Sequence, residues 1–143
     1  MNNNFFSQLK YFIIKLSKSF QWLYFIQNYI MDISFIEGES MLPTFKKKGT
    51  LVLIDKFSHI FFKPKINNII SLYHPYNKRI ILCKRLISIS NKGEKIWVEG
   101  DNKNNSLDSR DFGLINYSLI NGIIRLQIFP LIKWKFPPLN NKL

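Results

Sequence analysis

Residues 80–89, IILCKRLISI, form the stretch that bears most directly on the fold. The run is rich in Ile and Leu and contains no Gly or Pro, which is typical of a β-strand. With the two-residue period of a strand, Lys84 shares a face with Leu82 and Leu86, and Arg85 lies on the opposite face. A charged pair in such a strand usually lies at a sheet edge and reaches water. The other interpretation is burial, which would lower the pKa of Lys84.

Shorter β-rich runs surround this strand. They occupy residues 50–55, 69–73, 95–99 and 122–129. Residues 90–94 have the length and composition of a hairpin loop, so the strands on either side of them should pair. Several strands at this spacing predict a mostly β domain behind an N-terminal helix. We find no internal repeat in the sequence and no linker long enough to separate two β domains.

The first 36 residues have a different composition from the rest. They are aromatic and aliphatic from Phe5 onward, with Lys10, Lys15 and Lys18 near the start. The longest uncharged stretch, residues 19–31, has 13 residues, whereas a free-standing transmembrane helix needs about 20 mostly apolar ones. Hydropathy alone therefore makes this segment a marginal transmembrane helix.

The alternative to a spanning helix is an amphipathic helix in the membrane interface, with lysines and aromatic rings such as Trp22, Tyr24 and Tyr29 at headgroup depth. A cleaved targeting sequence is less favoured, because no small-residue cleavage site follows. We expect residues 1–31 to be a membrane-associated segment and residues 32–143 to form the second, folded domain.

Charge and cysteine content restrict the possible function classes. With 21 Lys and Arg against 9 Asp and Glu, the formal charge is +12, which suits an anionic membrane surface or a nucleic acid. No recognition helix, zinc-finger spacing or aromatic RNA-binding signature is present, so we do not expect nucleic-acid binding. The single cysteine, Cys83, excludes an internal disulfide. Two histidines and one cysteine make no zinc-ligand spacing, and no cofactor is implied.

The stretch EGESMLPT, residues 37–44, contains the first candidate catalytic residue, Ser40. Taken alone it is only a turn before a strand, as Ser and Pro form in many proteins. A nucleophilic serine also needs a base. His59 and His74 are poor candidates, since neither has an Asp nearby in a triad-like context. A lysine acts as a base only when neutral, which requires an apolar pocket, and Lys84 fits that requirement.

A third polar region follows the strands. Gly100-Asp101-Asn102 has the composition of a turn, and residues 106–113, SLDSRDFG, contain Asp108 and Arg110 two positions apart. These two side chains would form a local ion pair that fixes the loop. The alternative is a solvated polar loop without a catalytic role.

Taken together, the three regions resemble the type I signal peptidase family and, within it, the mitochondrial inner membrane peptidases. The family's boxes are matched by Ser40-Met41-Leu42-Pro43-Thr44, by Cys83-Lys84-Arg85-Leu86, and by Gly100-Asp101-Asn102 followed by Ser106-Leu107-Asp108-Ser109-Arg110 and Gly113. The resemblance covers about residues 30 to 130. Arg110 makes the chain more similar to the first of the two mitochondrial catalytic subunits than to the second.

The resemblance implies a coiled β-sheet fold and a role for each matched residue. Ser40 would attack the scissile carbonyl, and Lys84 would take its proton. Ser106 would hold the lysine amine, and Asp108 would form a supporting salt bridge with Arg110. The backbone N–H of Ser40 would donate to the oxyanion.

Two positions depart from the family's pattern. Gly38 stands where many bacterial members have a hydroxyl donor two residues before the nucleophile. The oxyanion hole would therefore depend on backbone groups. Asn67-Asn68 stands where the family usually has Gly-Asp before an aliphatic strand. That second position concerns loop geometry rather than chemistry.

The function implied by the resemblance is a membrane-bound serine endopeptidase that removes sorting or signal peptides from precursor proteins through an acyl-enzyme. The implied location is the mitochondrial inner membrane, with the catalytic domain facing the intermembrane space and a second peptidase subunit as partner. Alternatives are a signal peptidase of a bacterial cell membrane and an inactive adaptor subunit of a protease complex. A self-cleaving repressor-type domain would lack the Ser-x-Asp-Ser-Arg box.

Overall fold

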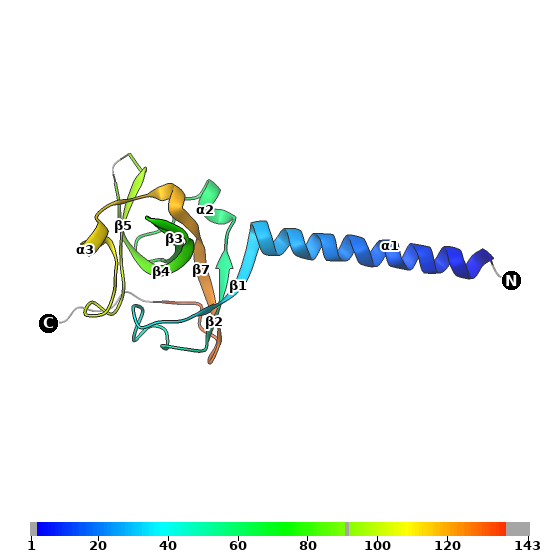
Figure 1. Cartoon of the computed structure of the whole chain (residues 1–143), viewed down its shortest axis with the longest axis horizontal. Helices are drawn as coiled ribbons and strands as arrows, with labels where there is room; N and C mark the ends of the chain where they lie inside the picture. Colours follow the sequence, from blue (N-terminus) through cyan, green and yellow to red (C-terminus); the bar gives the residue numbers. More distant parts are fainter. Residues whose placement is uncertain (1–2, 91, 137–143) are drawn as a thin grey trace.

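The apolar runs of the sequence pair into one antiparallel sheet. The structure is a computed structural model that describes residues 3–90 and 92–136. Its strands are β1 (Met31–Ile36), β2 (Thr50–Asp55), β3 (Ile69–His74), β4 (Asn77–Ile89), β5 (Lys95–Glu99), β6 (Ile115–Asn116) and β7 (Ile120–Phe129). They lie in the order β1-β2-β7-β3-β4-β5-β6. The sheet curls so that strands distant in this order approach one another (Figure 1). The predicted mostly β fold is confirmed.

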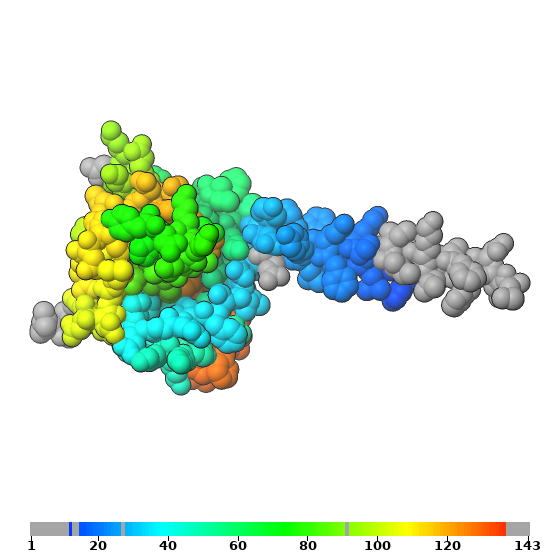
Figure 2. All heavy atoms as spheres, viewed as in Figure 1, coloured from blue at the N-terminus to red at the C-terminus, as the bar shows by residue number. Residues whose placement is uncertain are grey.

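Helical segments are short except at the N-terminus. They are α1 (Asn3–Phe25), the π-helical turn η1 (Ile26–Ile30), α2 (Ser58–Phe61), α3 (Ser109–Phe112) and the 3₁₀ turn η2 (Tyr117–Leu119). The long helix α1 projects away from the sheet, and η1 connects it to β1 (Figures 1 and 2). No helix among residues 3–90 and 92–136 combines the length and the apolarity needed to cross a membrane.

Two strands have the predicted bounds, three extend beyond them, and two were missed. The strands at 50–55 and 95–99 begin and end where the sequence predicts, and β4 pairs antiparallel with β5 across the expected hairpin, whose Asn91 lies outside the described residues. The missed strands are the two-residue β6 and β1, which the sequence analysis included in the apolar N-terminal stretch. β1 is the larger correction. Its outward side chains, Ile33 and Phe35, are apolar and exposed, so β1 lacks the polar outer face that usually identifies an edge strand.

Two buried clusters form the core. The first lies among β3 to β7, and its members are Ile70, Leu72, Leu86, Ile96, Val98, Ile115, Ile120 and Ile123. The second joins the loop after β1 to strands β2, β3 and β7, and its members are Met41, Phe45, Val52, Ile54, Ile69 and Ile124. The second cluster therefore fixes the segment that contains Ser40.

Candidate active site

Ser40 lies in the loop between β1 and β2, next to two anchoring side chains. Met41 and Phe45 are only 2% and 1% exposed, and burying each contributes about 1.5–3 kcal/mol. The backbone N–H of Phe45 donates to the carbonyl of Met41 over 2.9 Å. The ring of Phe45 packs edge-on against Phe136, with 5.3 Å between ring centroids. Apolar packing therefore holds the half-buried Ser40 where β1 ends.

Lys84 lies inside the protein, in the middle of β4. Its side chain does not reach water, since the residue is 2% exposed, so the strand-edge alternative is wrong. Its Nζ donates a hydrogen bond to the Ser106 hydroxyl over 2.8 Å. Burial lowers the pKa of the Lys84 amine, and the nearby Asp108 carboxylate opposes that shift only in part. The amine therefore loses its proton more easily than an exposed lysine does.

A directed chain of hydrogen bonds continues from Lys84. The Ser106 hydroxyl donates its own proton to Asp108 Oδ2 over 2.7 Å. Because that proton is used on Asp108, Ser106 can only accept from the amine. A neutral Lys84 amine therefore keeps its lone pair free for a different donor.

Asp108 is the fixed end of this chain. Its side chain is fully buried and pairs with Arg110, with 2.8 Å between Nη2 and Oδ2. The backbone N–H of Gly100 donates to the same oxygen over 2.8 Å. Burial alone would raise the pKa of Asp108, but the hydrogen bonds from Arg110, Gly100 and Ser106 outweigh it and hold the pKa far below its usual range. Asp108 therefore remains a carboxylate and cannot donate to Ser106.

Gly100 lies where the Ser40 loop and the Ser106 side chain meet. A Cβ at this position would lie 2.1 Å from Ser106 Oγ and 2.6 Å from the Ser40 carbonyl oxygen. Only glycine allows the two to come so close. Among the described residues no hydrogen bond joins the Ser40 hydroxyl to the Lys84 amine, a bond that in such sites often closes only with substrate present.

A second ion pair, buried on both sides, supports the site, and sequence reasoning missed it. Arg85 Nε and Nη2 donate to the two carboxylate oxygens of Asp101, each over 2.7 Å, and the two side chains are 4% and 3% exposed. Thr44, at the end of the Ser40 loop, donates its hydroxyl proton to Asp101. The available signal was an arginine inside an apolar strand, because a buried guanidinium requires a carboxylate partner.

The departure at Asn67 has a structural explanation. Asn67 has a backbone φ of +72°, in the left-handed region that glycine adopts freely and asparagine adopts more readily than other residues. Its carbonyl accepts a hydrogen bond from Arg85 Nη1 over 2.9 Å. Asn67 therefore preserves the turn that orients the buried arginine.

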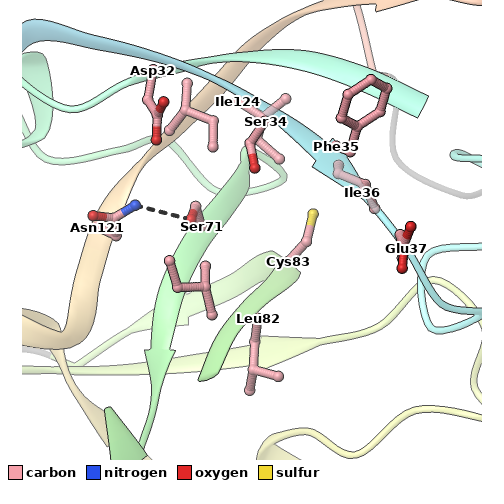
Figure 3. Close-up of a pocket in the computed structure, with 12 residues that line it drawn as sticks. Asp32, Ser34, Phe35, Ile36, Glu37, Ser71, Leu82, Cys83, Asn121 and Ile124 are labelled. Atoms are coloured by element: carbon pink, nitrogen blue, oxygen red, sulfur yellow. Dashed lines mark hydrogen bonds between the residues drawn. The ribbon is translucent and has the colours of Figure 1, made fainter. Parts of the chain in front are cut away.

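A pocket of about 130 Å³ opens between β1 and β4 (Figure 3). It is lined mainly by one face of β1 and by the β4 residues that directly precede Lys84. Cys83 points into it opposite Ser34 and Ile36, and Asn121 donates to the Ser71 hydroxyl at its other end (Figure 3). Burial raises the pKa of the Cys83 thiol to about 12. Cys83 is therefore a small pocket-lining side chain with little thiolate.

The two histidines lie on α2 and at the end of β3. The Nδ1 atom of His59 is buried and has no hydrogen-bond partner among the residues that the structure describes. Burial lowers the pKa of this imidazole. The ring of His74 is tilted against that of Tyr76 and meets the ring of Phe112 edge-on. Neither histidine belongs to the hydrogen-bonded chain around Lys84. Within the described ranges, no cluster of three or more His, Cys, Asp or Glu side chains is placed to hold a metal ion.

Comparison with known proteins gives a consistent set of relatives. The chain is 33% identical over 123 aligned residues to mitochondrial inner membrane protease subunit 1 of Xenopus tropicalis, covering 72% of each chain. It is 30% identical over 128 residues to subunit 1 of Homo sapiens, covering 76% of this chain and 75% of the relative. Subunit 2 of Schizosaccharomyces pombe is 26% identical over 129 residues. No family model matches the chain.

Proposed function

Because the chain belongs to the family of mitochondrial inner membrane protease subunits, we propose that it is a serine endopeptidase of the signal peptidase type, with Ser40 as nucleophile and Lys84 as general base. The observation that carries this proposal is the directed chain from Lys84 through Ser106 to Asp108. It holds a buried amine and leaves its lone pair free. A serine protease without a usable histidine needs such a base.

The chemistry follows from these groups. Lys84 Nζ takes the Ser40 hydroxyl proton as Oγ attacks the scissile carbonyl, and the resulting oxyanion accepts from the Ser40 backbone N–H. Collapse of the tetrahedral intermediate breaks the C–N bond, and Lys84 returns the proton to the leaving amine. A water molecule then attacks the acyl-enzyme carbonyl while Lys84 takes its proton. Lys84 returns this proton to Ser40 Oγ as the bond between Oγ and the acyl carbon breaks. Ser106, Asp108 and Arg110 orient the base and take no part in bond making.

The substrate binds as an added strand. β1 is an edge of the sheet, and β5 pairs only with the part of β4 from Arg85 onward. These two unpaired edges border the pocket in Figure 3. Its lining residues Glu37 and Cys83 lie three residues before Ser40 and one residue before Lys84 in the sequence. An extended peptide between them would form main-chain hydrogen bonds and place a side chain in the pocket. Substrates would be the membrane-tethered precursors whose sorting or signal peptides are removed.

The helix α1 attaches the enzyme to lipid, and residues 32–143 form the peptidase domain. Aromatic side chains of α1 are widely exposed, with Phe20 and Trp22 at 67% and Tyr24 at 68%, and Lys15 and Lys18 are exposed beside them. The site of action is the mitochondrial inner membrane, with the catalytic domain in the intermembrane space. The relatives include both subunit 1 and subunit 2 proteins, so a second peptidase subunit is the expected partner.

The test is cleavage by the full chain in detergent micelles of a mixed peptide library, with products identified by mass spectrometry. We expect a restricted set of cleaved sequences from the wild type and none from Ser40→Ala. Circular dichroism melting of both proteins controls for folding. Equal cleavage by Ser40→Ala would overturn the proposed nucleophile. A folded wild type that cleaves nothing, alone or with a subunit 2 partner, would instead indicate an adaptor subunit.

A further inference from the structure

One residue outside the proposed catalytic set holds both peptide groups of Ser40. Asn102 donates through its backbone N–H to the Ser40 carbonyl over 2.9 Å. Its side-chain Nδ2 donates to the carbonyl of Glu39 over 3.1 Å. These carbonyls belong to the two peptide groups that flank the Ser40 Cα. The orientation of the Ser40 backbone on both sides therefore depends on Asn102.

The bond to Glu39 determines the direction of the Ser40 N–H. The Glu39 carbonyl and the Ser40 N–H belong to the same peptide group, which is trans. In a planar trans peptide the C=O and the N–H point in opposite directions. A hydrogen bond that fixes the carbonyl therefore also aims the N–H. The carbonyl accepts a further bond from the Leu42 N–H over 3.1 Å, so Asn102 occupies its second lone pair.

This peptide group needs support from outside the turn. Gly38 lies one residue before it, with a φ of +108°, and as a glycine gives the start of the turn wide backbone freedom. Gly38 also contributes no hydroxyl donor, so the backbone N–H of Ser40 has more of the oxyanion to stabilise. A donor aimed at the developing charge is effective only when its direction is fixed beforehand.

Asn102 is itself firmly anchored. The preceding residue, Asp101, is held by the buried Arg85, and Gly100 is held by Asp108. The buried Arg85–Asp101 pair and the buried carboxylate of Asp108 thus both hold the three-residue turn that ends at Asn102. A rigid turn can transmit its orientation to the neighbouring loop, whereas a mobile one cannot.

We propose that Asn102 is a positioning residue that aims the Ser40 N–H at the oxyanion through its hydrogen bond to the Glu39 carbonyl. The inference rests on the proposed Ser40 chemistry and adds a residue that acts through Ser40 without touching substrate. Its role is confined to transition-state stabilisation. Substrate affinity and the pKa of Lys84 should not depend on it.

The test compares Asn102→Asp with Asn102→Ala in the full chain, in detergent micelles. The aspartate keeps the size of the side chain and replaces the donor with an oxygen that repels the Glu39 carbonyl. The alanine only removes the donor. We expect kcat to fall about tenfold in Asn102→Ala and about 100-fold in Asn102→Asp, toward the loss known for a deleted oxyanion donor, with KM unchanged in both. The substrate is a peptide selected from the library by its cleavage.

Two further measurements separate aiming from packing. The first uses a peptide aldehyde with the same residues on the acyl side of the cleaved bond. Ser40 Oγ adds to the aldehyde carbon, Lys84 takes the hydroxyl proton, and the carbonyl oxygen becomes an oxyanion. The affinity of the aldehyde should fall by the same factor as kcat/KM. The second uses a peptide in which the cleaved amide is replaced by an amine. This peptide should bind all variants equally. The matched control is Asn105→Ala, since Asn105 donates to the Glu39 carboxylate and not to its peptide group; we expect its kcat within about twofold of wild type.

The outcomes are distinguishable. A larger loss in Asn102→Ala than in Asn102→Asp, together with a lower melting temperature, would mean that Asn102 only fills space and would overturn the inference. Unchanged kcat in both variants would overturn it as well. Ser40→Ala serves as the reference in the same assay. If Ser40→Ala is inactive while the Asn102 variants remain fully active, the positioning role fails and the proposed function stands.

Discussion

At the residue scale, the Lys84 side chain meets two opposing requirements. It must lose its charge to act as a base, yet it lies near the carboxylate of Asp108, which favours the charged form. Burial has the larger effect, and the pKa of Lys84 is lowered. Ser106 separates the amine from the carboxylate and bonds to both. The intervening hydroxyl therefore orients the amine without a direct ion pair, which would keep it protonated.

The pH dependence of cleavage follows from this balance. The active form is the neutral amine, which predominates above the pKa, so kcat/KM should rise with pH. Because burial lowers the pKa of Lys84, the rise should level off below the usual lysine value of 10.5. A pH–rate profile of the full chain with the selected peptide measures this. A rate that falls as the pH increases through neutrality would be inconsistent with a lysine base.

The sequence predicted the role of one charged residue of β4 and missed the ion pair of its neighbour. Lys84 could be selected because a serine needs a base and few lysines lie in an apolar strand. Arg85 lies in the same apolar strand, but its partner Asp101 lies 16 positions away in a turn. Periodicity fixes which face of a strand a residue occupies, and it does not show which loop folds over that face. The Arg85–Asp101 pair therefore required the structure.

At the element scale, β4 positions most of the site. Its alternating faces direct Lys84 toward Ser106 and Arg85 toward Asp101. The strand also pairs with β3 and β5, so displacement of either charged residue would disturb the centre of the sheet. By contrast, β1 pairs with β2 on one side only, and its other side is an edge of the sheet. The run of Ile and Leu without Gly or Pro predicted most of β4, whereas the apolar outer face of β1 concealed a strand.

The contribution of the buried Arg85–Asp101 pair to stability can be measured by the same Arg→Lys substitution at this buried position and at an exposed one. Arg85→Lys loses the paired hydrogen bonds to Asp101 and the bond to the Asn67 carbonyl, because an ammonium cannot reproduce the planar fork of guanidinium. We expect the free energy of unfolding to fall by about 2–4 kcal/mol, since these bonds involve buried charged groups. Urea unfolding of the full chain in detergent gives this value.

The matched control is Arg125→Lys. Arg125 on β7 also pairs with an aspartate, Asp55, over 3.0 Å, but its side chain is 46% exposed. Exposed pairs contribute about 0–1 kcal/mol, so this variant should unfold close to wild type. Equal losses at the two positions would show that burial does not distinguish the pairs.

At the scale of the whole molecule, the long exposed helix α1 leads through η1 into β1, the edge strand that precedes the Ser40 loop (Figure 1). Along α1 from Lys15 to Phe25, every described side chain is exposed. Such an apolar, lysine-bearing surface suits the interface of a bilayer. The sequence indicated the helix and its composition, but how it meets lipid depends on the surrounding membrane as well as on the chain.

Membrane attachment through α1 predicts resistance to salt. Apolar burial is not screened by ions, whereas surface charge attraction is. The full chain should therefore remain with vesicles containing anionic lipid through a 1 M salt wash, a concentration at which the screening length is about 3 Å. Trp22→Glu should increase its release in a flotation assay. Tyr76→Glu, at an aromatic residue 80% exposed between β3 and β4, should leave retention unchanged. Complete release of the wild type by salt would show that only charge holds it.

The central claim is that Lys84 serves Ser40 as general base, and the kcat of Lys84→Arg tests it most directly. Arginine keeps the positive charge and most of the size but cannot give up its proton in a protein. The account predicts a loss of at least about 100-fold, at the lower end of what a general base contributes. The exposed Lys95 on the neighbouring strand provides the control, since Lys95→Arg should cleave the selected peptide normally. Near-normal cleavage by a folded Lys84→Arg would contradict the Ser40–Lys84 assignment and return the search for a base to His59 and His74.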